Sequence, residues 1–182
     1  LARLVSDRLI VISKQQSVEI GESFRVGRPD QIRVIPLGLD LDVFADYESR
    51  RAKFRHELCV PDDAILVGIV GRLTAIKNHA LFLHAISRLK ETDPACRRQG
   101  AVRFIVIGDG SLRSLLEQQT RTLGLEKDVI FVGSRNDPES FYPALDIVAL
   151  TSRNEGTPLT LIEAMANARP VISTVVGGVV DL

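Results

Sequence analysis

Short aliphatic and β-branched runs alternate along the chain with longer segments in which apolar residues recur at helical spacing. The runs expected to form strands are nearly continuous in apolar character and comprise Leu9–Ser13, Ile32–Pro36, Ile65–Val70, Arg103–Ile107, Val129–Val132, Ile147–Leu150 and Val171–Ser173. Such strands are typical of a parallel sheet that helices cover on both faces. The segments expected to form helices comprise Lys14–Phe24, Tyr47–Glu57, Asn78–Glu91, Leu112–Leu123, Glu139–Ala144 and Leu159–Asn167. The alternation predicts an α/β fold with a doubly wound parallel sheet.

Turn residues divide the chain into two unequal parts. A boundary is expected between residues 37 and 45, where turn residues precede a charged helix. Residues 1–40 are then the tail of a preceding domain with an interdomain linker, and residues 41–182 form most of a second domain. The chain starts at Leu1, and its last residues, Gly177–Leu182, come directly after the last strand. We therefore expect a piece of a longer protein, truncated at both ends, with the second domain incomplete at its end.

The composition narrows the classes of function. Lys and Arg together number 23, as do Asp and Glu, so the net charge is zero and a nucleic-acid-binding protein is not expected. Cys59 and Cys96 lack metal-site spacing and are expected to be free thiols in a reducing compartment. No apolar run reaches the roughly 18 residues of a membrane span. Neither the two cysteines nor the three histidines show metal-ligand spacing, so neither a metal ion nor another cofactor is expected.

The first candidate site is the loop that follows the strand Ile65–Val70. Ligands of open parallel sheets bind beyond the carboxyl ends of the strands. This loop starts at Gly71 and carries two cations, Arg72 and Lys77, just before a helix. Cations beside a helix N-terminus attract anions, because the free main-chain N–H groups and the helix dipole add to their charge. A diphosphate fits this site. The alternative is a pair of solvated surface cations.

The second candidate, Gly108-Asp109-Gly110-Ser111-Leu112, resembles a strand–turn–helix junction. The third glycine of the dinucleotide-binding fingerprint is missing, and the strand is not the first of its domain. We therefore favour a turn that needs positive φ over a dehydrogenase-like site. Asp109 and Asp146 are expected to lie at a loop and a strand end without chemistry. His79 is expected to be a solvated residue of a first helical turn, with a phosphate contact as the alternative.

The third candidate, Thr151–Ala166, carries two glutamates. Thr157 suits a helix N-cap and Pro158 suits the first helical position, so a helix is expected to start at Pro158 and to aim its N–H groups at the strand ends. Glu155 precedes that helix. Glu163 lies inside it among apolar residues, where an unpaired carboxylate is costly. The vicinal hydroxyls of a ribose would pair with Glu163; an ion pair with a cation such as Arg169, or exposure to water, is the alternative.

Together these motifs resemble the GT4 family of retaining glycosyltransferases. The resemblance runs from about Ile32 to Leu182 and rests on Gly71-Arg72-Leu73 with Lys77, on Gly108–Leu112, and on the two glutamates with seven residues between them. The stretch SRNEGTPLTLIEAMANARPVISTVVGG is its most specific part. The family implies the GT-B fold, in which two Rossmann-like domains face a cleft. This chain would supply the C-terminal, donor-binding domain and a remnant of the N-terminal domain.

The resemblance assigns roles to individual residues. Arg72 and Lys77 match the cations that bind the donor diphosphate and stabilise the leaving group, and Glu155 matches the acidic residue at the reacting sugar. We therefore expect these three residues to be catalytic. Glu163 matches the residue that binds the ribose. The donor-binding stretch is expected to comprise Gly156, Thr157, Pro158 and Leu159, with main-chain N–H groups in this stretch that hold sugar and phosphate oxygens.

The loop with Arg135 matches one that borders the nucleobase in the family, so Arg135 is a candidate donor-binding residue. Three other positions depart from the family pattern. In the interdomain segment the Asn of a frequent Asn-Gly pair is absent, because Leu37 precedes Gly38. Asn78 and Ala168 stand where the family often has glycine, at positions that favour left-handed φ. None of these departures removes a donor-binding group.

The function implied by the resemblance is transfer of a sugar, with retention, from a UDP- or GDP-sugar. The acceptor is a carbohydrate or a lipid-linked molecule, which the missing N-terminal domain would bind. A cytoplasmic location is expected, and that domain would allow peripheral contact with the inner face of the membrane. The alternative is a non-catalytic module that binds nucleotide sugars. The fragment alone is expected to bind its donor weakly and to transfer nothing.

Overall fold

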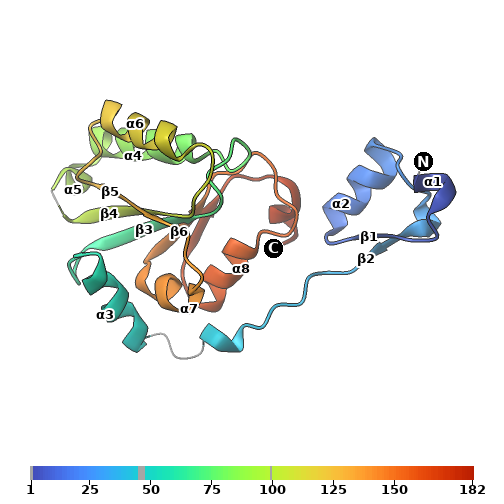
Figure 1. Ribbon diagram of the computed structural model, residues 1–182, viewed down its shortest axis with the longest axis horizontal. Helices are drawn as coiled ribbons and strands as arrows, with labels where there is room; N and C mark the ends of the chain where they lie inside the picture. Colours follow the sequence, from blue (N-terminus) through green and yellow to red (C-terminus); the bar gives the residue numbers. More distant parts are fainter. Residues whose placement is uncertain (1, 45–47, 99) are drawn as a thin grey trace.

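The protein folds around two separate parallel sheets, a small one near the N-terminus and a larger one in the rest of the chain (Figure 1). The structure is a computed structural model, which describes residues 2–44, 48–98 and 100–182. Residues 45–47 lie outside the described residues, and with them the expected helix start at Tyr47. The expected parallel α/β architecture is confirmed.

The small sheet pairs β1 (Leu9–Val11) with β2 (Ile32–Val34) in parallel. A short helix, α1 (Ala2–Val5), precedes β1, and α2 (Lys14–Val18) follows it. The helix expected as far as Phe24 continues beyond α2 only as a π-helical turn, Glu19–Ser23. An extended segment then leads from β2 to the 3₁₀ turn Asp42–Phe44 (Figure 1).

The large sheet has five parallel strands in the order β5-β4-β3-β6-β7. The strands are β3 (Ile65–Val70), β4 (Val102–Ile107), β5 (Val129–Gly133), β6 (Ile147–Leu150) and β7 (Val171–Ser173). The order reverses direction between β3 and β6, because the chain builds first to one side of β3 and then to the other. In open α/β sheets this switch point opens the crevice in which ligands bind.

Helices cover both faces of the large sheet, as its apolar strands require (Figure 1). On one face lie α4 (His79–Thr92) and α6 (Arg113–Thr122), with the short α5 (Pro94–Arg97) after α4. On the other lie α3 (Glu48–Glu57), α7 (Pro138–Phe141) and α8 (Leu159–Ala166). The segment expected as one helix over Glu139–Ala144 is divided into α7 and the 3₁₀ turn Tyr142–Ala144.

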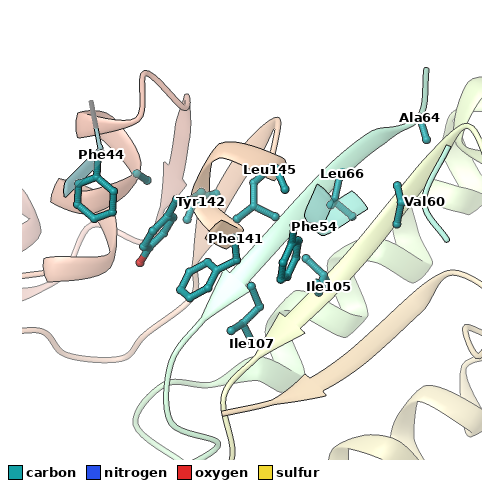
Figure 2. Close-up of a cluster of buried hydrophobic side chains, with 13 residues drawn as sticks. Phe44, Phe54, Val60, Ala64, Leu66, Ile105, Ile107, Phe141, Tyr142 and Leu145 are labelled. Atoms are coloured by element: carbon teal, nitrogen blue, oxygen red, sulfur yellow. The ribbon is translucent and has the colours of Figure 1, made fainter. Parts of the chain in front are cut away.

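Alternate residues of β4 supply the two cores that these helices complete. Ile105 and Ile107 face α3 and α7, where they join a cluster with Phe54 and Phe141 (Figure 2). Phe104 and the other residues of β4 with the opposite orientation join a second cluster under α4 and α6. A period of two residues therefore divides one apolar strand between two faces.

Asp146 has a larger structural role than its place at a strand end indicated. Its carboxylate accepts hydrogen bonds from Arg51 at 2.6 Å, from Arg55 at 3.2 Å and from the Leu66 N–H at 2.7 Å. Burial opposes ionisation of Asp146, but the Leu66 and arginine hydrogen bonds outweigh it and lower the carboxyl pKa. The Arg55 side chain is only 1% exposed, so this network joins α3 to the sheet from inside the core.

Candidate functional site

The loops that follow β3 and β6 are hydrogen-bonded to each other at the switch point of the sheet. The Arg153 N–H donates to the Ile76 carbonyl at 2.8 Å. The Thr151 hydroxyl donates to the carbonyls of Lys77, at 3.2 Å, and Asn78, at 3.0 Å. Asn78 has a φ of 50°, which confirms the left-handed geometry expected there. Two loops that are far apart in sequence therefore form one platform.

Lys77 and Glu155 meet on this platform in a close ion pair. The Lys77 Nζ lies 2.6 Å from the Glu155 Oε1, and the two side chains are 26% and 8% exposed. The Lys77 chain runs beside Gly71, where an added Cβ would lie 3.7 Å from the Lys77 Cδ. The structure thus brings together two of the three residues expected to be catalytic.

Ser152 and Thr174 support Glu155, and sequence reasoning missed both. The Ser152 hydroxyl donates to the Glu155 Oε1 at 2.5 Å, and Ser152 is almost completely buried. The Thr174 hydroxyl donates to the Ser152 carbonyl at 2.7 Å. Small hydroxyl residues directly after buried strands were the available signal, because a hydroxyl at that position can bond a neighbouring loop.

The glycine pair near the C-terminus packs against the loop that carries Glu155. A Cβ on Gly177 would lie 2.0 Å from the Glu155 carbonyl oxygen, and one on Gly178 would lie 1.8 Å from the Gly156 carbonyl oxygen. The Gly178 N–H also donates to the Glu155 carbonyl at 3.0 Å. No side chain larger than hydrogen fits at either position unless the loop moves.

Arg72 lines a hollow at the carboxyl ends of β3, β4 and β5. The hollow has a volume of about 260 Å³ and is lined by Val70, Gly71, Arg72, Ile107, Gly108, Asp109, Ser134 and Arg135. Arg72 is exposed, and no ion pair or hydrogen bond of its guanidinium is found among the described residues. Lys77 and Glu155 are next to this hollow through Gly71 but do not line it.

The loop after β3 packs directly against the Gly108-Asp109-Gly110 turn. Gly108 has a φ of 140°, and a Cβ there would lie 2.0 Å from the Gly71 carbonyl oxygen. A Cβ on Gly110 would lie 2.6 Å from the Leu73 carbonyl oxygen. The interpretation of this motif as a turn that needs positive φ is confirmed at Gly108. Gly110 serves close packing instead.

The start of α8 differs from the prediction. The helix begins at Leu159, one residue late, and the Thr157 hydroxyl does not cap it but donates to the Ile12 carbonyl at 3.3 Å. Pro158 has no N–H, and the Leu159 N–H is taken by the Thr157 carbonyl at 3.0 Å. Within the described residues, Gly156 and Thr157 keep main-chain N–H groups without a protein acceptor. The expected cradle is therefore shorter, because Pro158 and Leu159 contribute no available N–H group.

Glu163 has a protein partner that the sequence did not reveal. The Tyr142 hydroxyl donates to the Glu163 Oε2 at 2.8 Å. Burial and the Glu163 carboxylate raise the pKa of Tyr142, so its hydroxyl stays protonated and keeps donating. One turn before Glu163, the Thr160 hydroxyl lies 3.5 Å from the Val70 carbonyl, which places this face of α8 beside the end of β3.

Arg135 binds acidic side chains in the structure. Its guanidinium makes two hydrogen bonds to Asp137, at 2.8 Å and 2.7 Å, and one to Glu57 at 2.7 Å. Its guanidinium carbon lies 5.1 Å from the centre of the Phe54 ring. The donor-binding role expected for Arg135 therefore needs a main-chain or indirect contribution.

His79 is buried, so the expectation of a solvated residue is wrong. It is 3% exposed and, like Phe82, Leu83 and Ile86, lies on the inner side of α4. The spacing i, i+3, i+4, i+7 places all four on one face of a helix, which is the signal that sequence reasoning missed. Neither ring nitrogen has a hydrogen-bond partner among the residues that the structure describes. Burial, with the nearby Lys77 cation, lowers the pKa of His79 to about 4.

Metal-binding clusters and membrane-spanning helices are absent from the part of the chain that the structure describes. No group of three or more His, Cys, Asp or Glu side chains is placed to hold a metal ion. None of the helices described is both long and apolar enough to cross a bilayer. Cys59 and Cys96 are free.

Several proteins with similar sequences or folds are named as glycosyltransferases. A D-inositol 3-phosphate glycosyltransferase of Corynebacterium aurimucosum is 32% identical over 176 residues, which make up 95% of this chain and 42% of that protein. HepE of Anabaena, solved in complex with UDP and glucose, has 27% identity and a TM-score of 0.86 over 99% of this chain and 47% of its own. WaaG, a glycosyltransferase involved in lipopolysaccharide biosynthesis, shares the fold, with 22% identity and a TM-score of 0.81 over 94% of this chain and 45% of its own.

A match to a family model covers all five strands of the large sheet. The chain spans less than half the length of the curated relatives that it matches. The family model for glycosyl transferases, group 1, matches residues 50–182. Together with the parallel sheet and the GT-B neighbours, this match confirms the resemblance inferred from the motifs. The chain belongs to the group 1 family of glycosyl transferases, of which it represents the C-terminal half.

Proposed function

We propose that this chain supplies the donor site of a retaining glycosyltransferase that takes its sugar from a UDP- or GDP-sugar. The contact between Lys77 and Glu155 carries the proposal, because it joins a cation and a carboxylate from two loops at the switch point of the sheet. HepE, which is similar in sequence and fold and was solved with UDP and glucose, supports a nucleotide-sugar donor. A carbohydrate or lipid-linked acceptor completes the reaction.

The proposed roles follow from the charges that develop during transfer. When the bond between sugar and diphosphate breaks, negative charge grows on the leaving oxygen and positive charge on the anomeric carbon. Arg72 and Lys77 stabilise the first, and Glu155 lies beside the second while it contacts sugar hydroxyls. A well-placed donor of this kind lowers a barrier by about 3 kcal/mol. These cations perform the task that a divalent metal performs in other enzymes, so we propose metal-independent transfer.

The remaining groups hold the rest of the donor. The main-chain N–H groups of Gly156 and Thr157 have no acceptor in the described part of the chain and can bind sugar or phosphate oxygens. Glu163 binds the ribose hydroxyls with the carboxylate oxygen that Tyr142 leaves free. We also propose a cytoplasmic location, at the inner face of the membrane if the acceptor is lipid-linked. The free Cys59 and Cys96 fit a reducing compartment.

Donor binding must break the ion pair that holds Lys77. In the structure Glu155 neutralises Lys77, whereas a bound donor offers phosphate oxygens to Lys77 and hydroxyl groups to Glu155. An intact nucleotide sugar replaces both partners at once. Free UDP replaces only one, so it leaves Glu155 without its cation.

Calorimetric titration with UDP, GDP and their sugars tests the proposal. We expect weak binding of one nucleotide, and we expect the combined change Arg72→Ala and Lys77→Ala to abolish it. Undiminished binding by that variant would contradict the diphosphate site. In a protein that also contains an acceptor domain, Glu155→Gln should abolish sugar transfer. Transfer at the normal rate would contradict a catalytic role of Glu155 and would leave its loop only a role in binding.

A further inference from the structure

Arg135 lies in the loop after β5 and lines two pockets. One is the hollow that Arg72 lines. The other is a pocket of about 350 Å³ lined by Arg50, Lys53, Phe54, Glu57, Arg135, Asp137, Glu139 and Ser140. All three partners of the Arg135 guanidinium line the second pocket, and none lines the hollow. The guanidinium is thus held on the α3 side, although the residue forms part of the wall of the hollow.

The Arg135 guanidinium contacts Asp137, Glu57 and Phe54, and we call these four residues the Arg135 clamp. Asp137 binds two of the guanidinium nitrogens and Glu57, from α3, binds the third at 2.7 Å. The Arg135 side chain is 25% exposed, and Phe54 beneath it is buried in the core. Planar, bidentate pairing of this kind fixes orientation as well as charge.

The clamp holds a loop that has no other side-chain anchor of comparable strength among the described residues. β5 ends at Gly133, whose φ of 77° turns the chain and whose carbonyl accepts the Gly108 N–H at 2.8 Å. Ser134 follows and is exposed at the hollow. Arg135 is then the first residue after the turn with a fixed side chain, so its position determines where the wall at Ser134 stands.

We propose that Arg135 is a positioning residue, which sets the wall of the hollow for the nucleoside part of the donor through Glu57 and Asp137 rather than by touching the donor. This inference rests on the proposed function. A residue that binds the donor directly would be freed, and strengthened as a ligand, when Glu57 loses its charge. A positioning residue would be loosened by the same change, and donor binding would weaken.

Binding of the diphosphate and binding of the nucleoside can be measured separately. The diphosphate is expected at Arg72 and Lys77, which the Arg135 clamp does not touch. Inorganic pyrophosphate, which has no nucleoside, therefore reports on those cations alone. UDP and GDP report on the diphosphate site and on the nucleoside site together. The ratio of their affinity to that of pyrophosphate therefore measures the contribution of the wall of the hollow.

The test is calorimetric titration of the wild type, Arg135→Gln, Glu57→Gln and the double variant with UDP, GDP and pyrophosphate. Glu139→Gln is the matched control, since it removes the same charge from the same pocket and Glu139 makes no ion pair among the described residues. Thermal melting checks that each variant is folded. If Arg135→Gln does not fold, Arg135→Lys retains the charge without the bidentate geometry.

We expect Glu57→Gln to weaken nucleotide binding about threefold and Arg135→Gln about tenfold, with the double variant no worse than Arg135→Gln. Pyrophosphate binding and the Glu139→Gln control should not change. Nucleotide binding that is unchanged or tighter in Glu57→Gln would overturn the proposal, as would loss of pyrophosphate binding in Arg135→Gln. A wild type that binds pyrophosphate but neither nucleotide would refute the proposed function and the clamp with it.

Discussion

Replacement of Glu155 by Gln should tighten the binding of free UDP or GDP while it removes sugar transfer. In the structure Glu155 is the partner of Lys77, with 2.6 Å between nitrogen and oxygen. A nucleotide without a sugar must take Lys77 from Glu155 and gives the carboxylate nothing in return. Gln keeps the shape of the side chain and can still accept from Ser152, but it holds Lys77 far less strongly.

The size of the effect follows from the burial of the pair. At 2.6 Å and an effective dielectric constant of about 20, the direct attraction is about 6 kcal/mol. Desolvation of Glu155, which is 8% exposed, offsets most of this attraction, and Lys77 at 26% stays partly hydrated. A net value of about 1 kcal/mol remains, and its removal corresponds to roughly fivefold tighter binding of the nucleotide.

Calorimetry on the wild type, Glu155→Gln and Lys77→Met measures the effect. Lys77→Met should weaken binding, because it removes the cation itself. Glu91→Gln is the matched control, since it removes the same charge from an exposed ion pair at the far end of α4. If Glu155→Gln weakens nucleotide binding as Lys77→Met does, the exchange of partners described above is refuted.

Three further predictions concern stability. Asp146→Asn should lower the free energy of unfolding in urea by about 3 kcal/mol, because the buried Arg55 loses its carboxylate. Since folding lowers the pKa of Asp146, the stability that Asp146 contributes is complete above the ordinary pKa of 3.8 and is lost below it. A variant as stable as the wild type would contradict this role of Asp146. Gly178→Ala should cost about 2 kcal/mol or more in the same assay, whereas Gly38→Ala, with open space around it, should cost little. His79→Leu should abolish a loss of stability as the pH falls from 6.5 to about 4, because only the unfolded state protonates His79 in that range; urea titrations that still show this loss would refute the reasoning.

Much of the fold follows from the apolar pattern. The strands Ile65–Val70, Ile147–Leu150 and Val171–Ser173 have the predicted bounds, because each is a continuous apolar run between turn residues. Helix ends were less predictable. Thr157 has the chemistry of an N-cap, but its hydroxyl bonds the Ile12 carbonyl, which lies 145 positions earlier in the sequence. Local propensity carries no information on such a long-range partner.

The same distinction separates the predicted and the missed parts of the site. The strand order brings Lys77 and Glu155 to one edge of the sheet, so their proximity follows from the alternation of elements. The partners of Arg135 do not follow, because Glu57 lies on a helix whose packing depends on the whole core. His79 was a different failure, because its helical spacing was visible but its polar ring favoured an exposed position.

The hydrogen bonds between the two loops use main-chain carbonyls of residues 76–78 as acceptors. The side chains of Ala75 and Ile76 are exposed and take no part in these bonds. Substitutions at these two positions therefore leave the main-chain hydrogen bonds between the loops intact, while each new side chain lies within two residues of Lys77. For directed evolution of altered sugar preference, positions 75 and 76 are suitable for saturation libraries, because most library members should still fold.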